Sequence, residues 1–163
     1  YAASQSLLSR FENKILGNRQ GLHALDGVLQ RSIDPLLKRE GKARLILDLD
    51  SSEDPAHGRQ EGVNYNGHFR KNCYHPLFCF TSSGICLAGK LREGNVHSAH
   101  GALEMLSPIV ERYRKHFKQF WLRGDAAFAK PELYGYCEQR EMTYFIRLKS
   151  NNTLKNQIGR AHV

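Results

Sequence analysis

The chain has 163 residues, 40% of them hydrophobic and 25% charged, and a formal net charge of +8. There are enough apolar residues for a packed core, which excludes an intrinsically disordered chain, and no apolar run is long enough to cross a membrane. The excess of Lys and Arg favours a polyanionic partner such as nucleic acid. The four cysteines form no C-x-x-C pair, so we expect reduced thiols and a cytosolic setting.

The first half of the chain is predicted to run from helix to strand to loop. Residues 4–40 repeat apolar side chains at helical intervals, and Pro35 is expected to break or kink this helix. Residues 43–50 form a short apolar run, which is typical of a strand covered on both faces. Residues 51–73 are polar and rich in turn formers, so they are predicted to be a loop.

The second half of the chain is predicted to alternate strands and helices. The turn sequence TSSG between two apolar segments indicates an antiparallel hairpin, and a stripe of apolar residues at helical spacing indicates a core-facing helix. We predict helices at 98–117 and 130–142, and strands at 77–80, 85–91, 119–125 and 143–150. This order predicts an α/β fold with a mixed sheet and helices packed against it.

Two aspartates follow apolar strands at points 75 residues apart. Asp50 ends one predicted strand and Asp125 ends another. Functional side chains gather beyond the strand ends of layered α/β folds. If the two strands are neighbours, the carboxylates converge and need a cation, and Mg²⁺ or Mn²⁺ prefers oxygen ligands of this kind. Such ions promote phosphodiester displacement. Each aspartate alone could instead form a turn or cap a helix.

The segment LDLD also permits a different enzyme. A D-x-D sequence after an apolar strand resembles the first motif of haloacid-dehalogenase-type phosphatases, in which Asp48 would accept the phosphoryl group and Asp50 would act as acid and base. That family usually has Thr or Val at the position held here by Ser52, and the later sequence GDAAFAK lacks the second Asp of its last motif. A non-catalytic DNA-binding domain and a nuclease remain further alternatives.

Several long blocks of the sequence resemble the IS1380-type DDE transposases of bacterial insertion sequences. The blocks are SQSLLSRFEN, LDLDSSEDPAHGRQEG, CYHPLFCF, LREGNVHSAHGALEML, LRGDAAFAKPELYGYCEQREMTYFIRL and SNNTL. The resemblance implies an RNase H-like mixed sheet and metal-dependent DNA strand cleavage and transfer. It implies that Asp50 and Asp125 are the first two catalytic and metal-binding acids, with Asp48 and Asp54 as neighbours. The third acid that it implies, a glutamate on a later helix, has no match.

The resemblance also implies a domain organisation and a set of binding partners. We expect residues 1–41 to be part of a helical DNA-binding region and 42–157 to be the catalytic core, truncated before the third acid and therefore inactive. The ending IGRAHV looks foreign, so 158–163 are expected to be a tail. The expected partners are transposon-end and target DNA, in a dimeric complex in the bacterial cytoplasm near the nucleoid, without a membrane. Candidate DNA contacts are His57, Arg59, Gln60, Arg70, Lys71 and Arg123.

Overall fold

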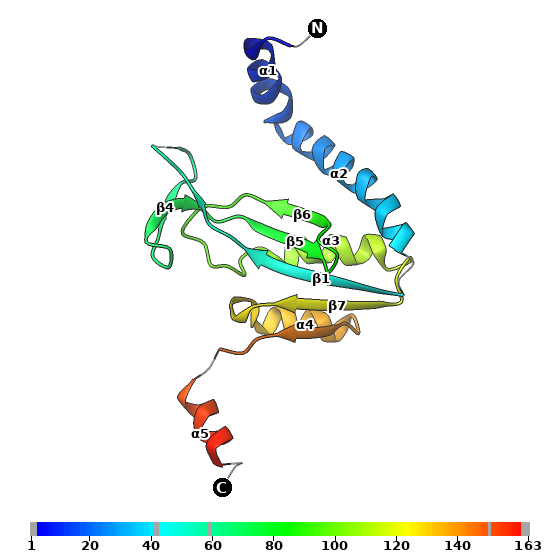
Figure 1. The fold of residues 1–163 in the computed structure, drawn as a ribbon, viewed down its shortest axis with the longest axis vertical. Coiled ribbons are helices and arrows are strands. Elements are labelled where there is room, and N and C mark those ends of the chain that lie inside the picture. Colours follow the sequence, from blue (N-terminus) through cyan, green and yellow to red (C-terminus); the bar gives the residue numbers. More distant parts are fainter. Residues whose placement is uncertain (1–2, 41–42, 59, 150, 161–163) are drawn as a thin grey trace. The chain divides into compact units, whose positions relative to one another are not determined.

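The computed structural model describes residues 3–40, 43–58, 60–149 and 151–160 (Figure 1). The chain divides into two compact units, Tyr1–Gly41 and Lys42–Val163. The first unit is helical and the second contains the sheets. Among the described residues, no helix combines the length and apolarity that a bilayer crossing requires.

The first unit consists of helix α1 (Gln5–Phe11), a π-helical turn η1 (Glu12–Leu16) and helix α2 (Arg19–Glu40). Ser4 caps α1, because its hydroxyl accepts a hydrogen bond from the Leu7 amide. Helix α2 continues past Pro35, so the expected break at that residue is wrong. A proline removes one backbone donor, and the remaining hydrogen bonds of a 22-residue helix hold it together.

A five-stranded sheet forms the centre of the second unit, in the order β6-β5-β1-β7-β8. Strands β5 and β6 run antiparallel as a hairpin, β5 pairs antiparallel with β1, and β7 and β8 continue parallel to β1. This order and these directions confirm the expected RNase H-like mixed sheet. The strands are β1 (Arg44–Ser51), β5 (Leu77–Thr81), β6 (Cys86–Lys90), β7 (Gln119–Gly124) and β8 (Thr143–Ile146).

Helices α3 (Ala102–Tyr113) and α4 (Pro131–Gln139) cover one face of this sheet and lie behind it in Figure 1. Helix α3 contacts β5 and α4, and α4 contacts β8. Pro131 opens α4 at its first position, as predicted, because the missing N–H has no partner there anyway. The fully buried large side chains of the core come from both layers: Leu47, Leu77, Leu106, Leu122, Phe128 and Leu133.

A second, three-stranded sheet lies where the sequence predicted a loop, so that prediction is wrong. Its strands are β2 (Asp54–Pro55), β3 (Asn64–Asn66) and β4 (Lys71–Tyr74), in the order β2-β4-β3. Asn66 organises it: its side-chain oxygen accepts from the amides of His68 and Phe69, and its Nδ2 donates to the Gly94 carbonyl over 2.6 Å. Side-chain hydrogen bonds of this kind leave no periodic apolar pattern to detect.

A further helix, α5 (Asn152–Arg160), follows β8. It was not predicted, because its sequence is mostly polar, with two apolar residues, Leu154 and Ile158. The boundary that we expected at residue 158 falls within this helix, and the foreign origin of 158–163 stays a prediction.

Candidate active site

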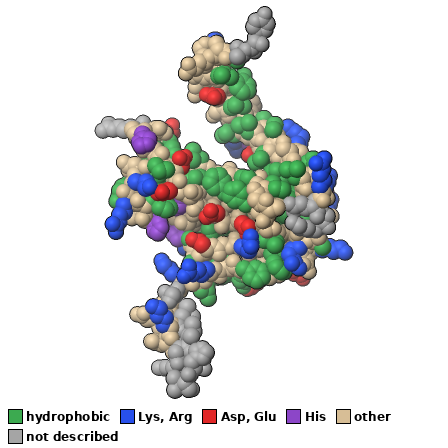
Figure 2. All heavy atoms as spheres, in the orientation of Figure 1, with side chains coloured by type: hydrophobic (Ala, Val, Ile, Leu, Met, Phe, Trp, Pro, Cys, Tyr) green, Lys and Arg blue, Asp and Glu red, His purple; other side chains and the backbone are tan. Residues whose placement is uncertain are grey.

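Strand β1 presents opposite chemistry on its two faces. Leu45, Leu47 and Leu49 are at most 4% exposed and face the helices. Because side chains alternate along a strand, Asp48 and Asp50 lie on the other face, which α3 and α4 do not cover. Figure 2 looks onto this second face of the sheet. Acidic side chains gather there beside Lys and Arg, among apolar side chains.

The strand register brings the two predicted catalytic aspartates together. Strands β1 and β7 pair in parallel, and their last Cα partners are Asp48 and Arg123. Two residues farther along, each chain returns to the same face, which places Asp50 beside Asp125 at one end of adjoining strands. Both aspartates are exposed. The two strands are therefore neighbours, whereas the meeting of the two carboxylates and their catalytic role stay predictions.

Asp125 is held in a defined orientation. Its backbone is extended, with φ −76° and ψ −175°, and its Oδ1 accepts a hydrogen bond from the Ala127 amide over 2.9 Å. This makes Asp125 the N-cap of the short 3-10 helix η2 (Ala126–Phe128). Capping of the helix and the predicted binding of a metal are therefore compatible at Asp125, because the cap occupies one carboxylate oxygen and leaves the other available.

Asp48 is engaged by Arg123. The Arg123 Nε lies 2.5 Å from Asp48 Oδ1 and its Nη2 lies 2.6 Å from Oδ2, a two-pronged ion pair. The hydrogen bonds to Asp48, and then its charge, raise the pKa of Arg123. An attacking carboxylate needs a free oxygen, so this geometry speaks against Asp48 as a phosphoryl acceptor. It also gives Arg123 a carboxylate partner, while its contact with DNA stays a prediction.

The other predicted DNA contacts lie on or near the three-stranded sheet. Lys71 pairs with Glu53 over 2.9 Å, and Arg70 is exposed with a positive φ of 57°. His57 and Gln60 are also exposed, and the Gln60 amide donates to the His57 carbonyl over 3.2 Å. Arg59 lies outside the described residues.

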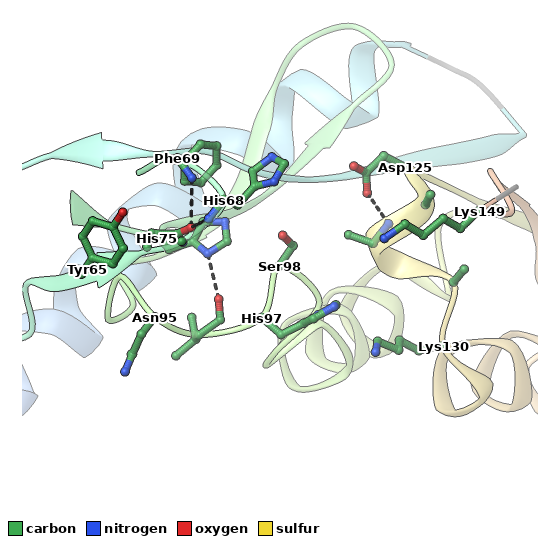
Figure 3. Close-up of a pocket in the computed structure, with 16 residues that line it drawn as sticks. Tyr65, His68, Phe69, His75, Asn95, His97, Ser98, Asp125, Lys130 and Lys149 are labelled. Atoms are coloured by element: carbon green, nitrogen blue, oxygen red, sulfur yellow. Dashed lines mark hydrogen bonds between the residues drawn. The ribbon is translucent and has the colours of Figure 1, made fainter. Parts of the chain in front are cut away.

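A cavity of about 830 Å³ adjoins Asp125 (Figure 3). His75, His97, Lys130 and Lys149 line it, and the sequence analysis assigned none of them a function. No sequence signal singled them out, because they come from separate loops that only the fold brings together. In the sequence, each of these four residues lies within or directly beside one of the blocks that resemble the transposase family.

The buried cysteines are not part of this site. Burial is the main cause that raises the pKa of Cys79 to about 12 and that of Cys137 to about 11. Both side chains are fully buried. Both thiols are therefore held in the protonated form at neutral pH, which makes them poor nucleophiles.

Comparison with solved structures gives transposases. The cryo-EM structure of the piggyBac transposase synaptic complex with hairpin DNA aligns with 66% of this chain and 23% of that chain, at 19% identity and a TM-score of 0.44. The crystal structure of the catalytic domain of Mos1 mariner transposase aligns with 99% of this chain and 74% of that chain, at 13% identity and a TM-score of 0.45.

The Mos1 mariner paired end complex with Mn aligns with 99% of this chain and 50% of that chain, at 11% identity and a TM-score of 0.45. The present chain therefore spans about a quarter of the piggyBac transposase chain and half of the Mos1 chain in the complex with Mn. A search of curated proteins gave no match.

The sequence itself decides the family. A family model described as "Transposase DDE domain group 1" matches residues 1–162, which is nearly the whole chain. The match includes the strand that carries Asp50 and the strand that precedes Asp125. The chain belongs to this family of transposase DDE domains.

Proposed function

We propose that the chain acts on DNA as a transposase of the IS1380 type, cutting and joining phosphodiester bonds at the ends of a bacterial insertion sequence. The observation that carries this proposal is the parallel pairing of β1 and β7, whose carboxyl ends carry the exposed residues Asp50 and Asp125. Membership in the transposase DDE family supports it, as does the net charge of +8, which attracts a DNA backbone.

The carboxylates at the ends of β1 and β7 fit a divalent metal such as Mg²⁺ or Mn²⁺. Within the described residues, neither Asp50 nor Asp125 is in an ion pair, so both offer carboxylate oxygen to a hard cation. Asp48 is already neutralised by Arg123 and is not proposed as a ligand. When bound, divalent metal would supply activation of the attacking oxygen and stabilisation of the leaving oxygen.

The chain's own residues orient the reacting groups. Arg123 pairs with both carboxylate oxygens of Asp48, which fixes that side chain on the face of β1 that also carries Asp50. The cap hydrogen bond from Ala127 fixes Asp125. We assign backbone contacts to the basic and polar side chains predicted from the sequence: His57, Arg59, Gln60, Arg70, Lys71 and Arg123. Residues 1–41 are proposed to contact DNA as well.

A third acid completes the site in the family that the sequence resembles. The described residues hold no group of three His, Cys, Asp or Glu side chains that could bind one metal ion. We infer that the pair of Asp50 and Asp125 alone binds metal weakly, and that cutting requires a further carboxylate in addition to these two. The active complex is proposed to be a dimer on paired ends, in the cytoplasm near the bacterial nucleoid.

Metal binding tests the carboxylate pair directly in the 163-residue chain. We expect Mn²⁺, followed by calorimetry or by its electron spin resonance signal, to bind the native chain and to lose most of its affinity in Asp50→Asn and in Asp125→Asn. Asp54→Asn is the matched control, because Asp54 is an exposed neighbouring acid on β2. Equal affinity in all four chains would end the assignment.

Strand chemistry tests the function. The protein is incubated with labelled insertion-end DNA and Mg²⁺, and both nicking and joining are scored. We expect Asp50→Asn to abolish both. Nicking without joining would indicate a nuclease, and DNA binding that survives in Asp50→Asn and Asp125→Asn without any cutting in the native protein would indicate a non-catalytic domain.

A further inference from the structure

Asp48 and Arg123 form a fixed pair on the face of the five-stranded sheet that α3 and α4 leave uncovered (Figure 2). They are Cα partners on β1 and β7, and the next partner of Arg123, on β8, is Phe145. On its other side, Asp48 is the Cα partner of Phe80 on β5. The pair therefore lies within a row of residues from four adjoining strands.

The ion pair uses one edge of the Arg123 guanidinium and leaves another edge free. Nε donates to Oδ1 of Asp48 over 2.5 Å, and Nη2 donates to Oδ2 over 2.6 Å. A guanidinium carries its N–H donors in a planar fork, so both donors of Nη1 and one of Nη2 remain. Within the described part of the chain, Asp48 is the only acceptor of Arg123, whose side chain is 50% exposed. The remaining donors are therefore open to an acceptor from outside the chain.

A phosphate group has the geometry that this free edge requires. Two phosphate oxygens accept from two parallel N–H groups of one arginine, and such charge-assisted hydrogen bonds are strong. Side chains on one face of a strand repeat every second residue, about 7 Å apart. Arg123 is one such step from Asp125 along β7, as Asp48 is from Asp50 along β1. A DNA strand at the proposed reaction centre would thus bring a neighbouring phosphate within reach of Arg123.

Asp48 affects a phosphate contact of Arg123 in two opposite ways. A free arginine side chain has many rotamers, and ordering it when DNA binds costs conformational entropy. The pair with Asp48 orders the guanidinium when the chain folds, which favours the contact. The negative charge of Asp48, in contrast, repels a DNA backbone. The two effects have opposite signs, so the change in DNA affinity on removal of Asp48 tells which one is larger.

We propose that Asp48 is a positioning residue, which holds Arg123 in place to bind a phosphate of the DNA strand next to the bond that is cut. The proposal rests on DNA being the substrate, as proposed above. It gives Asp48 a role other than that of a metal ligand or a phosphoryl acceptor, and both of its carboxylate oxygens serve that role.

DNA binding without divalent metal tests this role separately from catalysis. Fluorescence anisotropy in EDTA follows a labelled insertion-end duplex with the 163-residue chain over a series of salt concentrations. We expect Arg123→Ala to weaken binding and to lower the slope of log affinity against log salt by about one, because one phosphate contact is lost. We expect Asp48→Ala to weaken binding in the same way, even though it removes a negative charge.

Glu111→Ala is the matched control, because Glu111 also pairs with arginines, Arg114 and Arg140, but lies on helix α3. Its removal should not weaken DNA binding. In a chain that already carries Arg123→Ala, the further change Asp48→Ala should not weaken binding either, because no arginine is left to hold. Urea unfolding checks that each variant is folded, which we expect because a partly exposed ion pair contributes little to stability.

Three results would overturn the proposal. The first is an Asp48→Ala chain that binds DNA as tightly as the native chain or more tightly, which would show that Asp48 acts through its charge alone. The second is the same loss from Asp48→Ala with and without Arg123, which would indicate a general effect on the fold. The third is an unchanged salt slope in Arg123→Ala, which would exclude the phosphate contact.

These outcomes are distinguishable from failure of the proposed function. None of the variants changes Asp50 or Asp125, and the measurement needs neither metal nor cutting. Failure here therefore leaves the Mn²⁺ test of those two aspartates standing. A native chain that binds no DNA at all would overturn the proposed function and this proposal together.

Discussion

The five-stranded sheet and the three-stranded sheet are held together by different forces. The larger sheet has strands of four to eight residues whose inward side chains are buried under α3 and α4. The smaller sheet has strands of two to four residues and depends on hydrogen bonds from Asn66. The larger sheet fixes the carboxylate pair, and the smaller one shapes the neighbouring cavity. Hydrophobic burial thus positions the proposed chemistry, and polar contacts position the loop between β3 and β4 that lines the cavity.

Truncating the core of the larger sheet should have the largest effect. Leu122 is fully buried on β7, so Leu122→Ala is expected to lower the free energy of unfolding by about 2–5 kcal/mol, measured in urea. Phe145→Ala is the control, because Phe145 is 53% exposed on the neighbouring strand. If both variants lost the same amount, burial under the helices would not be what stabilises this sheet.

Adding a side chain at Gly94, whose backbone lies against the smaller sheet, should have the second-largest effect on stability. A Cβ at Gly94 would lie 2.0 Å from the Cys73 carbonyl oxygen and 2.4 Å from that of Asn64, both backbone atoms of β4 and β3. Gly94→Ala should therefore lower the free energy of unfolding by about 1–3 kcal/mol, measured in urea. Gly67→Ala has open space around it and should cost far less. A Gly94→Ala chain with native stability would show that this backbone contact does not hold the smaller sheet.

Freeing Asp48 should have a smaller effect on stability and a visible effect on metal binding. Arg123→Met removes a partly exposed ion pair, which is worth about 0–1 kcal/mol. It also leaves an extra carboxylate charge on the face that carries Asp50, so Mn²⁺ affinity is expected to rise. Arg140→Met is the control, because Arg140 pairs with Glu111 on α3. A fall in Mn²⁺ affinity in Arg123→Met would contradict the neutralising role of Arg123.

The smallest expected effect is a pH dependence at the cavity. The pKa of His97 is lowered in the folded chain from its ordinary value of 6.5. The unfolded chain therefore binds more protons just below pH 6.5, and stability falls as the pH drops through the folded pKa. Urea unfolding at pH 7.5 and at pH 5.5 should show a smaller loss in His97→Gln than in the native chain. An identical loss in both would assign the pH dependence to other groups.

The larger sheet was predictable because its residues carry a periodic apolar pattern. The strand at 43–50, the hairpin with its TSSG turn and the helix that begins at Pro131 all appear in the structure. The three-stranded sheet and α5 were missed, because short polar segments owe their structure to tertiary hydrogen bonds rather than to periodicity. Continuation of α2 past Pro35 was missed because one lost donor does not end a long helix.

The candidate site divides in the same way. Asp50 and Asp125 were predictable because each follows an apolar strand, and one pairing of neighbouring strands then sets them together. The sequence did not identify Asp48 as the partner of Arg123, because it does not give the register that sets these two residues opposite each other. The cavity residues His75, His97 and Lys130 were out of reach, because they lie on three loops whose approach depends on the whole fold.

The cap at Asp125 has a consequence for timing. A side chain that is free to rotate must be frozen each time substrate and cation arrive, and that ordering slows assembly of a reactive complex. The hydrogen bond from Ala127 freezes this carboxylate when the chain folds, so the site meets its substrate already aligned. Asp125→Glu keeps the charge but lengthens the side chain, so the carboxylate loses this fixed orientation even though its charge remains.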